Sequence, residues 1–250
     1  MASRIPRWRG SLVYRRHALT RRFSRSCEAP IVKILNPADN TVVAEVAEDT
    51  PVAVRSKYLR ARAAQPGWAA LPLKKRLNVI RAFRERITAM RETLSRTLTR
   101  EVGKPIKQSR NELDGLLGRI DFFLLEASQV LRQEKVYADA GHKLEERISH
   151  EPLGVIANIS AWNYPYFVGS NVFVPALISG NAVLYKPSEH ATLTGMHIAE
   201  MFAEAGIPKD VLIPVIGGGA AGAALLRQNV DGVFFTGSYA TGAKVGAVAG

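Results

Sequence analysis

Two segments of this chain decide its fold: Val155-Ile-Ala-Asn-Ile159, followed by Ser160-Ala-Trp-Asn-Tyr-Pro165, and Ala182-Val-Leu-Tyr185, followed by Lys186-Pro-Ser-Glu189. Each begins as a short apolar run and ends in turn and polar residues, which is the pattern of a buried strand that leads into a loop. Because the runs are mostly apolar rather than alternating, we expect both faces of each strand to be covered.

The same pattern continues to the end of the chain. Further apolar runs lie at 211–216 and 233–235, and helix-like stretches lie at 165–179, 192–205 and 220–228, with another opening at about 238. Strands that alternate with helices favour parallel pairing through right-handed crossovers. The sequence therefore predicts an α/β fold, with a Rossmann-like parallel sheet and flanking helices.

The part of the chain before this sheet begins with two predicted strands, at 31–35 and 41–46, around a turn. Thr50 is a good N-cap for a helix that begins at Pro51. The pair Pro66-Gly67 is expected to end this helix at about Gln65.

Two long amphipathic helices should follow, because apolar residues recur in steps of three and four over 73–98 and over 113–131. Gly103-Lys104-Pro105 should break the first. The polar segment 137–150 predicts a hairpin or an extended arm.

The composition is that of a globular chain. Of its 250 residues, 47% are hydrophobic and 22% are charged, which excludes disorder as the main state. The single cysteine, Cys27, excludes a disulfide framework, a cysteine-rich zinc site and a Cys-x-x-Cys redox pair. The five histidines form no zincin motif. We therefore expect no metal site.

The net charge of +12 comes mainly from one end of the chain. Residues 1–27 contain eight arginines and no acid, and the remainder has 26 basic and 22 acidic residues. Charge confined to a tail argues against a specific nucleic-acid partner. Residues 1–28 are typical of a mitochondrial transit peptide, the alternatives being a disordered basic extension or a misassigned start. The expected location is mitochondrial in a eukaryote and cytoplasmic otherwise, with the folded domain over 29–250.

A charge-free stretch from Pro152 to Tyr185 is long enough to span a bilayer. It also contains four asparagines, together with Pro165 and Pro175. A spanning helix would leave these polar groups in lipid, at a high cost. A buried strand–loop–helix–strand unit explains the stretch better, so we expect no membrane partner.

Gly217-Gly-Gly-Ala-Ala-Gly222 matches the G-x-G-x-x-G spacing, after a strand and at the start of a helix. The acidic residue that a dinucleotide site carries about 20 residues further on is absent. Contact of Gly217 with a pyrophosphate is one interpretation. Close packing, or contact with an adenine, is the favoured one.

A second glycine turn, Thr236-Gly237-Ser238-Tyr-Ala-Thr241-Gly242, directly follows the run at 233–235. Backbone N–H groups and hydroxyls at the start of a helix suit an anionic phosphate. The alternative is a plain serine N-cap after a glycine turn.

Polar loops also follow the two deciding strands. Lys186 and Glu189 lie just past a strand's carboxyl end, where open α/β sheets bind ligands. A lysine can donate to ribose hydroxyls, and a carboxylate accepts from them and repels a 2′-phosphate. Asn163 can present its amide to a developing oxyanion. The alternatives are a solvated ion pair and an ordinary loop asparagine.

In this order and spacing, the motifs resemble the NAD(P)-dependent aldehyde dehydrogenase superfamily, from about residue 31 to the end of the chain. The segments that carry the resemblance are Glu101–Pro105, Pro152–Ile156, Trp162–Pro165, Asn181–Glu189, Ala205–Pro208 and Phe235–Gly242.

The resemblance implies NAD as the cofactor, with NADP possible, a small aldehyde as the substrate, and a homo-oligomer for the full-length protein, with 137–150 as part of its oligomerisation arm. It implies that Lys186 and Glu189 meet the adenosine ribose, with Glu189 favouring NAD, and that Asn163 is an oxyanion donor. Other cofactor contacts would be Ser160, Trp162, Gly217, Gly237, Ser238, Thr241 and Gly242. In the family a cysteine thiolate attacks the aldehyde, hydride passes to the nicotinamide, and a glutamate activates water.

Two features depart from the family pattern. Ala161 replaces the proline common before Trp-Asn, which mainly alters loop stiffness. The chain ends at Gly250, before the family's Glu-Leu-Gly-Gly strand and its nucleophilic cysteine, and Cys27 lies in the tail. We therefore expect an incomplete cofactor-binding domain that is inactive by itself. The alternative is a non-catalytic module that binds a dinucleotide or pairs with a full-length relative.

Overall fold

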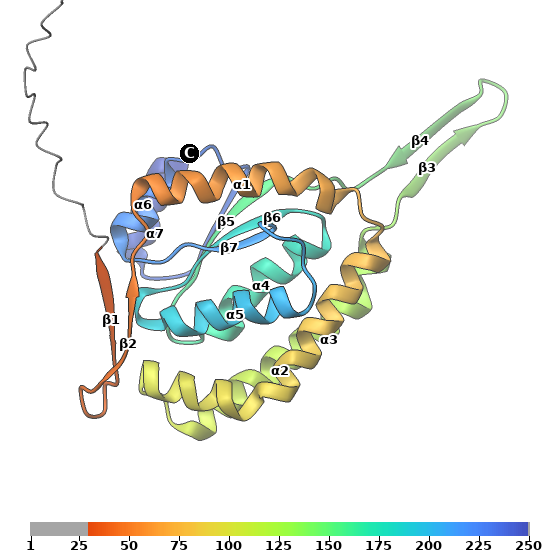
Figure 1. The fold of residues 1–250 in the computed structure, drawn as a ribbon. Coiled ribbons are helices and arrows are strands. Elements are labelled where there is room, and N and C mark those ends of the chain that lie inside the picture. The colour runs from red at the N-terminus through yellow and green to blue at the C-terminus, as the bar shows by residue number, and fades with distance from the viewer. Residues whose placement is uncertain (1–29, 250) are drawn as a thin grey trace, which may run out of the picture.

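A computed structural model describes residues 30–249 of the chain (Figure 1), so the transit-peptide interpretation of residues 1–28 lies outside the described residues. The helices are α1 (Pro51–Ala69), α2 (Leu73–Val102), α3 (Ile106–Val130), α4 (Pro165–Ile178), the short 3-10 helix η1 (Glu189–Ala191), α5 (Thr192–Glu204), α6 (Gly219–Leu226) and α7 (Tyr239–Ala249). The strands are β1 (Ile31–Leu35), β2 (Val42–Ala47), β3 (Glu134–Asp139), β4 (Leu144–Ile148), β5 (Val155–Ile159), β6 (Ala182–Lys186), β7 (Leu212–Pro214) and β8 (Gly232–Phe235).

The central sheet is parallel, in the order β7-β6-β5-β8. Every residue of β5 and β6 is buried, including the polar Asn158 and Lys186, as the mostly apolar runs predicted. The chain adds strands to one side of β5 and then returns with β8 on its other side, which is the strand order at the centre of a Rossmann sheet. The predicted Rossmann-like parallel sheet is confirmed, with β7 shorter than the apolar run at 211–216.

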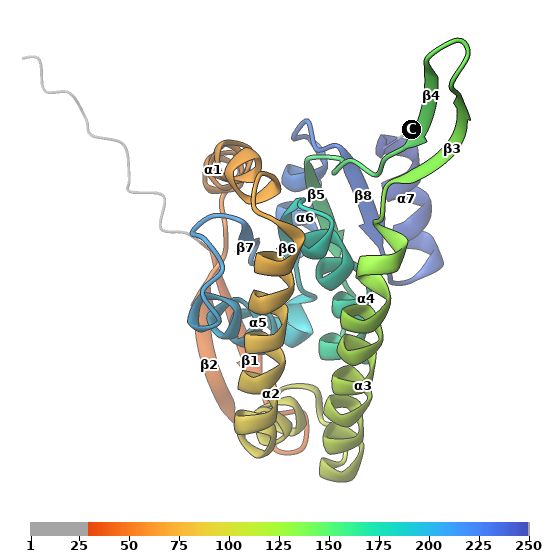
Figure 2. The ribbon, with the colours of Figure 1, turned by 90° about the vertical axis from the view of Figure 1, so that its right-hand side faces the viewer.

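Helices cover both faces of this sheet (Figures 1 and 2). α1 and α6 pack on one face, and α4 and α5 pack on the other, where α2 and α3 add an outer layer. The core of the thicker side includes the ring of Phe83, stacked 3.7 Å from that of Phe202, with Phe173 edge-on to both. This packing holds the strands rigidly, so the loops at their carboxyl ends are fixed in place.

The predicted end of the first helix at Gln65 is wrong, because α1 continues through Pro66 to Ala69. Tertiary contacts hold its last turn. The buried Trp68 donates from its indole nitrogen to the carbonyl of Leu177 at 2.9 Å, and Gln65 donates to that of Gly180 at 3.0 Å. These contacts offset the hydrogen bond that proline cannot make.

The segment predicted as a hairpin or arm is the antiparallel pair β3–β4, which extends away from the body of the molecule (Figures 1 and 2). Nearly all of its residues are exposed, among them the apolar Val136, Tyr137, Leu144 and Ile148. An extended hairpin of this kind buries almost nothing within its own chain. Within residues 30–249, no helix is both long and apolar enough to cross a bilayer.

Candidate functional site

The loops after β5, β6 and β8 meet at one edge of the sheet, because parallel neighbours end on the same side. Two backbone hydrogen bonds join them. The N–H of Ser160 donates to the carbonyl of Lys186 at 3.0 Å, and the N–H of Thr236 donates to that of Ile159, also at 3.0 Å. Between β5 and β8 the strand order reverses, and such a point at the carboxyl ends is where open α/β sheets hold their ligands.

Ser160 and Trp162 lie in the loop after β5. Ser160 is buried, and its hydroxyl has no partner in good hydrogen-bond geometry among residues 30–249, although it lies close enough to the Tyr185 phenol to lower the pKa of that group against the larger effect of burial. A buried hydroxyl without a partner is costly, and a ligand in the cleft could satisfy it. The indole of Trp162 is half exposed and stands edge-on to His190, with ring centroids 6.4 Å apart.

Asn163 is held by both of its carbonyl oxygens. Its side-chain Oδ1 accepts from the N–H of Tyr164 at 3.1 Å, and its backbone oxygen accepts from Lys104 Nζ at 2.6 Å. The side-chain Nδ2 donates to no group in the described part of the chain, and the residue is exposed. This geometry leaves an oriented amide donor free for an oxyanion.

Sequence reasoning missed the buried ion pair behind this loop. Lys104 Nζ lies 2.5 Å from Glu112 Oε2 and 3.8 Å above the ring of Tyr164. Glu112 Oε1 in turn accepts from the N–H of Tyr166 at 2.9 Å, in the first turn of α4. Burial raises the pKa of the Glu112 carboxyl although the Lys104 charge opposes the shift. The pair therefore joins α3, the Asn163 loop and the start of α4.

Glu101 makes a similar connection at the start of α5. Its carboxylate accepts from the backbone N–H groups of Leu193 at 2.6 Å and Thr194 at 3.0 Å, and from the Thr194 hydroxyl at 2.8 Å. Burial raises its pKa to about 7, against the opposing effect of these hydrogen bonds. Glu101 stands in a motif identified from the sequence, but no local pattern shows that its carboxylate caps a helix far along the chain.

Lys186 and Glu189 lie together at the end of β6. Lys186 is 5% exposed, and its ammonium donates to the carbonyl of Pro187 at 3.0 Å and lies 3.9 Å from the Glu189 carboxylate. It makes no other hydrogen bond within residues 30–249, so N–H donors remain for a ligand. Burial lowers the pKa of Lys186, and the charge of Glu189 opposes that shift. A buried cation beside a half-exposed carboxylate suits a pair of sugar hydroxyls.

Gly217 lies in the turn between β7 and α6, with a φ of 135° that favours glycine. The turn is held by Asp49, whose carboxylate accepts from the N–H of Ile216 at 2.7 Å. At the other end of the motif, Gly222 packs on Lys186: an added methyl group would lie 3.4 Å from Lys186 Cε. These contacts support the close-packing interpretation of the glycine motif.

The turn after β8 begins α7. Ser238 Oγ accepts from the N–H of Thr241 at 3.3 Å, and the carbonyl of Ser238 accepts from the N–H of Gly242 at 2.9 Å. The serine N-cap offered as one alternative is therefore present. Gly237 and Gly242 leave room for the ring of Phe235, which an added methyl group would approach to 2.5 Å and 3.2 Å respectively. The turn itself is exposed, so a cap and a phosphate contact are compatible.

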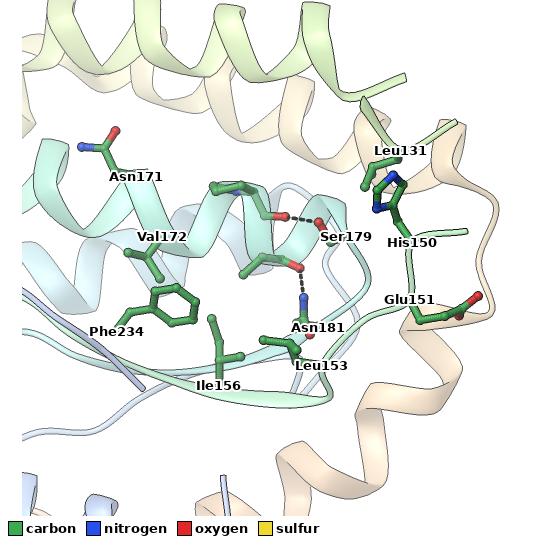
Figure 3. Close-up of a pocket in the computed structure, with 12 residues that line it drawn as sticks. Leu131, His150, Glu151, Leu153, Ile156, Asn171, Val172, Ser179, Asn181 and Phe234 are labelled. Atoms are coloured by element: carbon green, nitrogen blue, oxygen red, sulfur yellow. Dashed lines mark hydrogen bonds between the residues drawn. The ribbon is translucent and has the colours of Figure 1, made fainter. Parts of the chain in front are cut away.

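An open pocket of about 360 Å³ lies elsewhere, between α4, the base of the β3–β4 hairpin and β8 (Figure 3). Its lining includes His150, Asn171 and Phe234. Ser179 and Asn181 also face it, and both donate to carbonyls of α4, at 2.8 Å and 3.1 Å. None of the predicted site residues lines this pocket, so it is distinct from the candidate site. No group of three or more His, Cys, Asp or Glu side chains among residues 30–249 could hold a metal ion.

The strand order, the helices on both faces and the polar loops at one edge define a doubly wound α/β domain of the Rossmann type. Residues 23–250 match the model of the aldehyde dehydrogenase family, and the chain belongs to that family.

Relatives with curated names are similar over most of this chain. An N-succinylglutamate 5-semialdehyde dehydrogenase of Chromobacterium violaceum is 36% identical over 209 residues, which are 83% of this chain and 42% of that protein. The chain thus spans less than half the length of this relative.

Solved structures of dehydrogenases have the same fold over most of this chain. The NADP-dependent glyceraldehyde-3-phosphate dehydrogenase of Bacillus halodurans, complexed with NADP, has a TM-score of 0.82 at 27% identity, over 88% of this chain and 48% of that one. A point mutant of betaine aldehyde dehydrogenase from Staphylococcus aureus, complexed with NAD+, has a TM-score of 0.83 at 30% identity, over 88% of this chain and 45% of that one.

Proposed function

We propose that this chain forms the cofactor-binding half of an aldehyde dehydrogenase and that the nucleotide it holds is NAD. One observation carries the proposal: the loops after β5, β6 and β8 leave the sheet at one edge, and this edge holds a buried lysine that has donors left for a ligand. The likeness to a betaine aldehyde dehydrogenase in complex with NAD+ supports the same assignment.

The residues present fit the adenosine and pyrophosphate of a dinucleotide. Lys186 would donate to the ribose hydroxyls and Glu189 would accept from them, beside Gly217. Ser160, whose buried hydroxyl has no partner in good hydrogen-bond geometry within residues 30–249, would line the cleft together with Trp162. The turn after β8 would approach the pyrophosphate through the first-turn N–H groups of α7, with Gly237, Ser238, Thr241 and Gly242 as its contacts.

For the chemistry, the nicotinamide supplies the hydride acceptor when the cofactor is bound. In this chain, the free side-chain amide of Asn163 would donate to the oxygen of an aldehyde as negative charge develops on it. Lys104 fixes the backbone of Asn163, and the N–H of Tyr164 holds its side-chain Oδ1 and so sets the direction of that amide. The cysteine nucleophile and the glutamate base of the family have no counterpart among residues 30–249.

The reaction proposed for a complete enzyme of this kind is the NAD-dependent oxidation of an aldehyde to a carboxylic acid. The name of the Chromobacterium relative makes a semialdehyde the first substrate to test in any longer form of the protein. For the 250-residue chain alone we expect nucleotide binding without turnover.

Calorimetric titration of the purified 250-residue chain with NAD tests the proposal. We expect one saturable site per chain. Lys186→Met should weaken binding at least about tenfold, because a hydrogen bond from a charged donor contributes about 1.5–3 kcal/mol. Lys209→Met removes an exposed lysine and is the matched control, with a change of less than about twofold. A folded parent chain that fails to bind NAD overturns the proposal.

The β3–β4 hairpin supports a role in assembly. Its apolar side chains are exposed and would be covered in an oligomer. Sedimentation of the chain with and without residues 134–148 tests this role. A hairpin-dependent association supports it, and identical behaviour contradicts it. The same assay, with a full-length relative added, tests the alternative of a non-catalytic pairing module.

A further inference from the structure

A second carboxylate, that of Glu48, lies beside the candidate ribose site. Glu48 directly follows β2, and a methyl group added to Gly217 would lie 3.0 Å from its Oε2. An equivalent methyl group on Gly218 would lie 3.9 Å from Glu189 Oε1. Two carboxylates that come from segments far apart in the sequence therefore flank two consecutive glycines of one turn.

The position of Glu48 is built into the fold. Its backbone N–H donates to the carbonyl of Pro30 at 2.6 Å. The next residue, Asp49, makes two bonds to Ile216: its N–H donates to the Ile216 carbonyl at 2.8 Å, and its carboxylate accepts from the Ile216 N–H at 2.7 Å. Lys57 lies 2.5 Å from the Asp49 carboxylate and holds it in turn. The β2–α1 connection is thus fastened to the turn before Gly217.

The Glu48 carboxylate itself has no protein partner among residues 30–249: it takes part in none of the hydrogen bonds or ion pairs of that part of the chain. It is half-buried. Its negative charge reaches Lys186, where it acts with Glu189 to oppose the effect of burial on the lysine pKa. A carboxylate without a protein partner in this part of the chain is free to interact with a group that binds beside Gly217.

The charges around the ribose site therefore do not balance. Among residues 30–249, Lys186 lies 3.9 Å from the Glu189 carboxylate, and the charges of both Glu189 and Glu48 act on it. Hydroxyl groups of a ribose are neutral and can accept from the lysine and donate to either carboxylate. A phosphate on the 2′-oxygen would bring negative charge against both carboxylates, in surroundings that water screens poorly.

We propose that Glu48 is a specificity-determining residue of this site and disfavours nucleotides that carry a 2′-phosphate. The inference rests on the proposed binding of NAD and adds to it a residue outside the sheet that helps select between NAD and NADP. The fold alone does not make this choice, because solved relatives of the same fold hold NADP in one case and NAD+ in another.

The test measures the dissociation constants of NAD and NADP for the 250-residue chain by calorimetry, at low and at high salt. Glu48→Gln keeps the shape of the side chain and removes its charge. We expect the preference for NAD over NADP to fall by about fivefold or more at low salt and by less at high salt. Glu48→Asp keeps the charge and should retain most of the preference. Glu45→Gln, on β2, removes the same net charge from an exposed residue paired with Lys33 and should change the preference less than about twofold.

The outcomes separate the two proposals. A parent chain that is folded but binds neither nucleotide overturns the proposed function and this inference together. A parent chain that binds NAD, with a Glu48→Gln variant of the same melting temperature and the same preference, overturns the inference and leaves the proposed function standing. An equal effect in Glu45→Gln also overturns it, because the effect would then come from net charge alone.

Discussion

Replacement of Lys104 by methionine should destabilise the protein more than the loss of a surface ion pair does. The Lys104 ammonium is mostly buried, 2.5 Å from the fully buried Glu112 carboxylate, and it also donates to the carbonyl of Asn163 at 2.6 Å. Removal of one partner of a buried pair leaves the other charge without compensation, which typically costs about 3–5 kcal/mol. Glu112 keeps its bonds to the start of α4 and has a raised pKa, so protonation limits the loss. We therefore expect about 3 kcal/mol.

The assay is urea and thermal unfolding of the two chains, followed by circular dichroism. A loss of about 3 kcal/mol corresponds to a melting temperature lower by about 6–12 °C for a chain of this size. Arg91→Met is the matched control, because it breaks a pair with Asp114 that is exposed on both sides and should cost less than about 1 kcal/mol. The stability lost in Lys104→Met should be smaller at low pH, where Glu112 takes up a proton and no longer needs a cation beside it. A loss no larger than that of the control refutes the reasoning.

Three further predictions concern pH, a glycine and activity. Between pH 4.5 and about 7 the buried Glu101 holds its proton only in the folded state, so its contribution to stability should fall by on the order of 3 kcal/mol as the pH rises through this range. Urea unfolding of the parent and of Glu101→Gln measures this contribution as the difference between their pH profiles, and profiles of the same shape contradict it. Gly217→Ala should lower the stability of the protein by about 1–3 kcal/mol in thermal melts, since the φ of Gly217 is 135° and the new methyl group would lie 2.9 Å from the Cβ of Ala221. Gly118→Ala is the control: it adds a methyl group at an open position of a helix and should not destabilise the protein. The chain should form no NADH from NAD and any aldehyde, and NADH above background would count against that.

The sequence alone determined the strands and their pairing class. The strand Val155–Ile159 has the same bounds in the structure as in the prediction. A run of five mostly apolar residues that leads into a turn is stable mainly as a strand of a sheet that is covered on both faces. Parallel pairing then places the residues after β5, β6 and β8 on one edge. For this reason the exit of the loops that carry Ser160, Lys186 and Ser238 from the same edge of the sheet followed from local patterns, while the roles of these residues toward a nucleotide remain proposals.

Contacts between distant segments were decided only by the tertiary structure. Nothing near Glu48 in the sequence indicates Gly217, and nothing near Lys104 indicates Asn163. The continuation of α1 past Pro66 depends on the docking of Trp68. Local patterns record which backbone conformation and which degree of burial a residue favours. They do not predict which side chains come into contact. Those contacts depend on how the helices and strands pack against one another, which is a property of the whole chain.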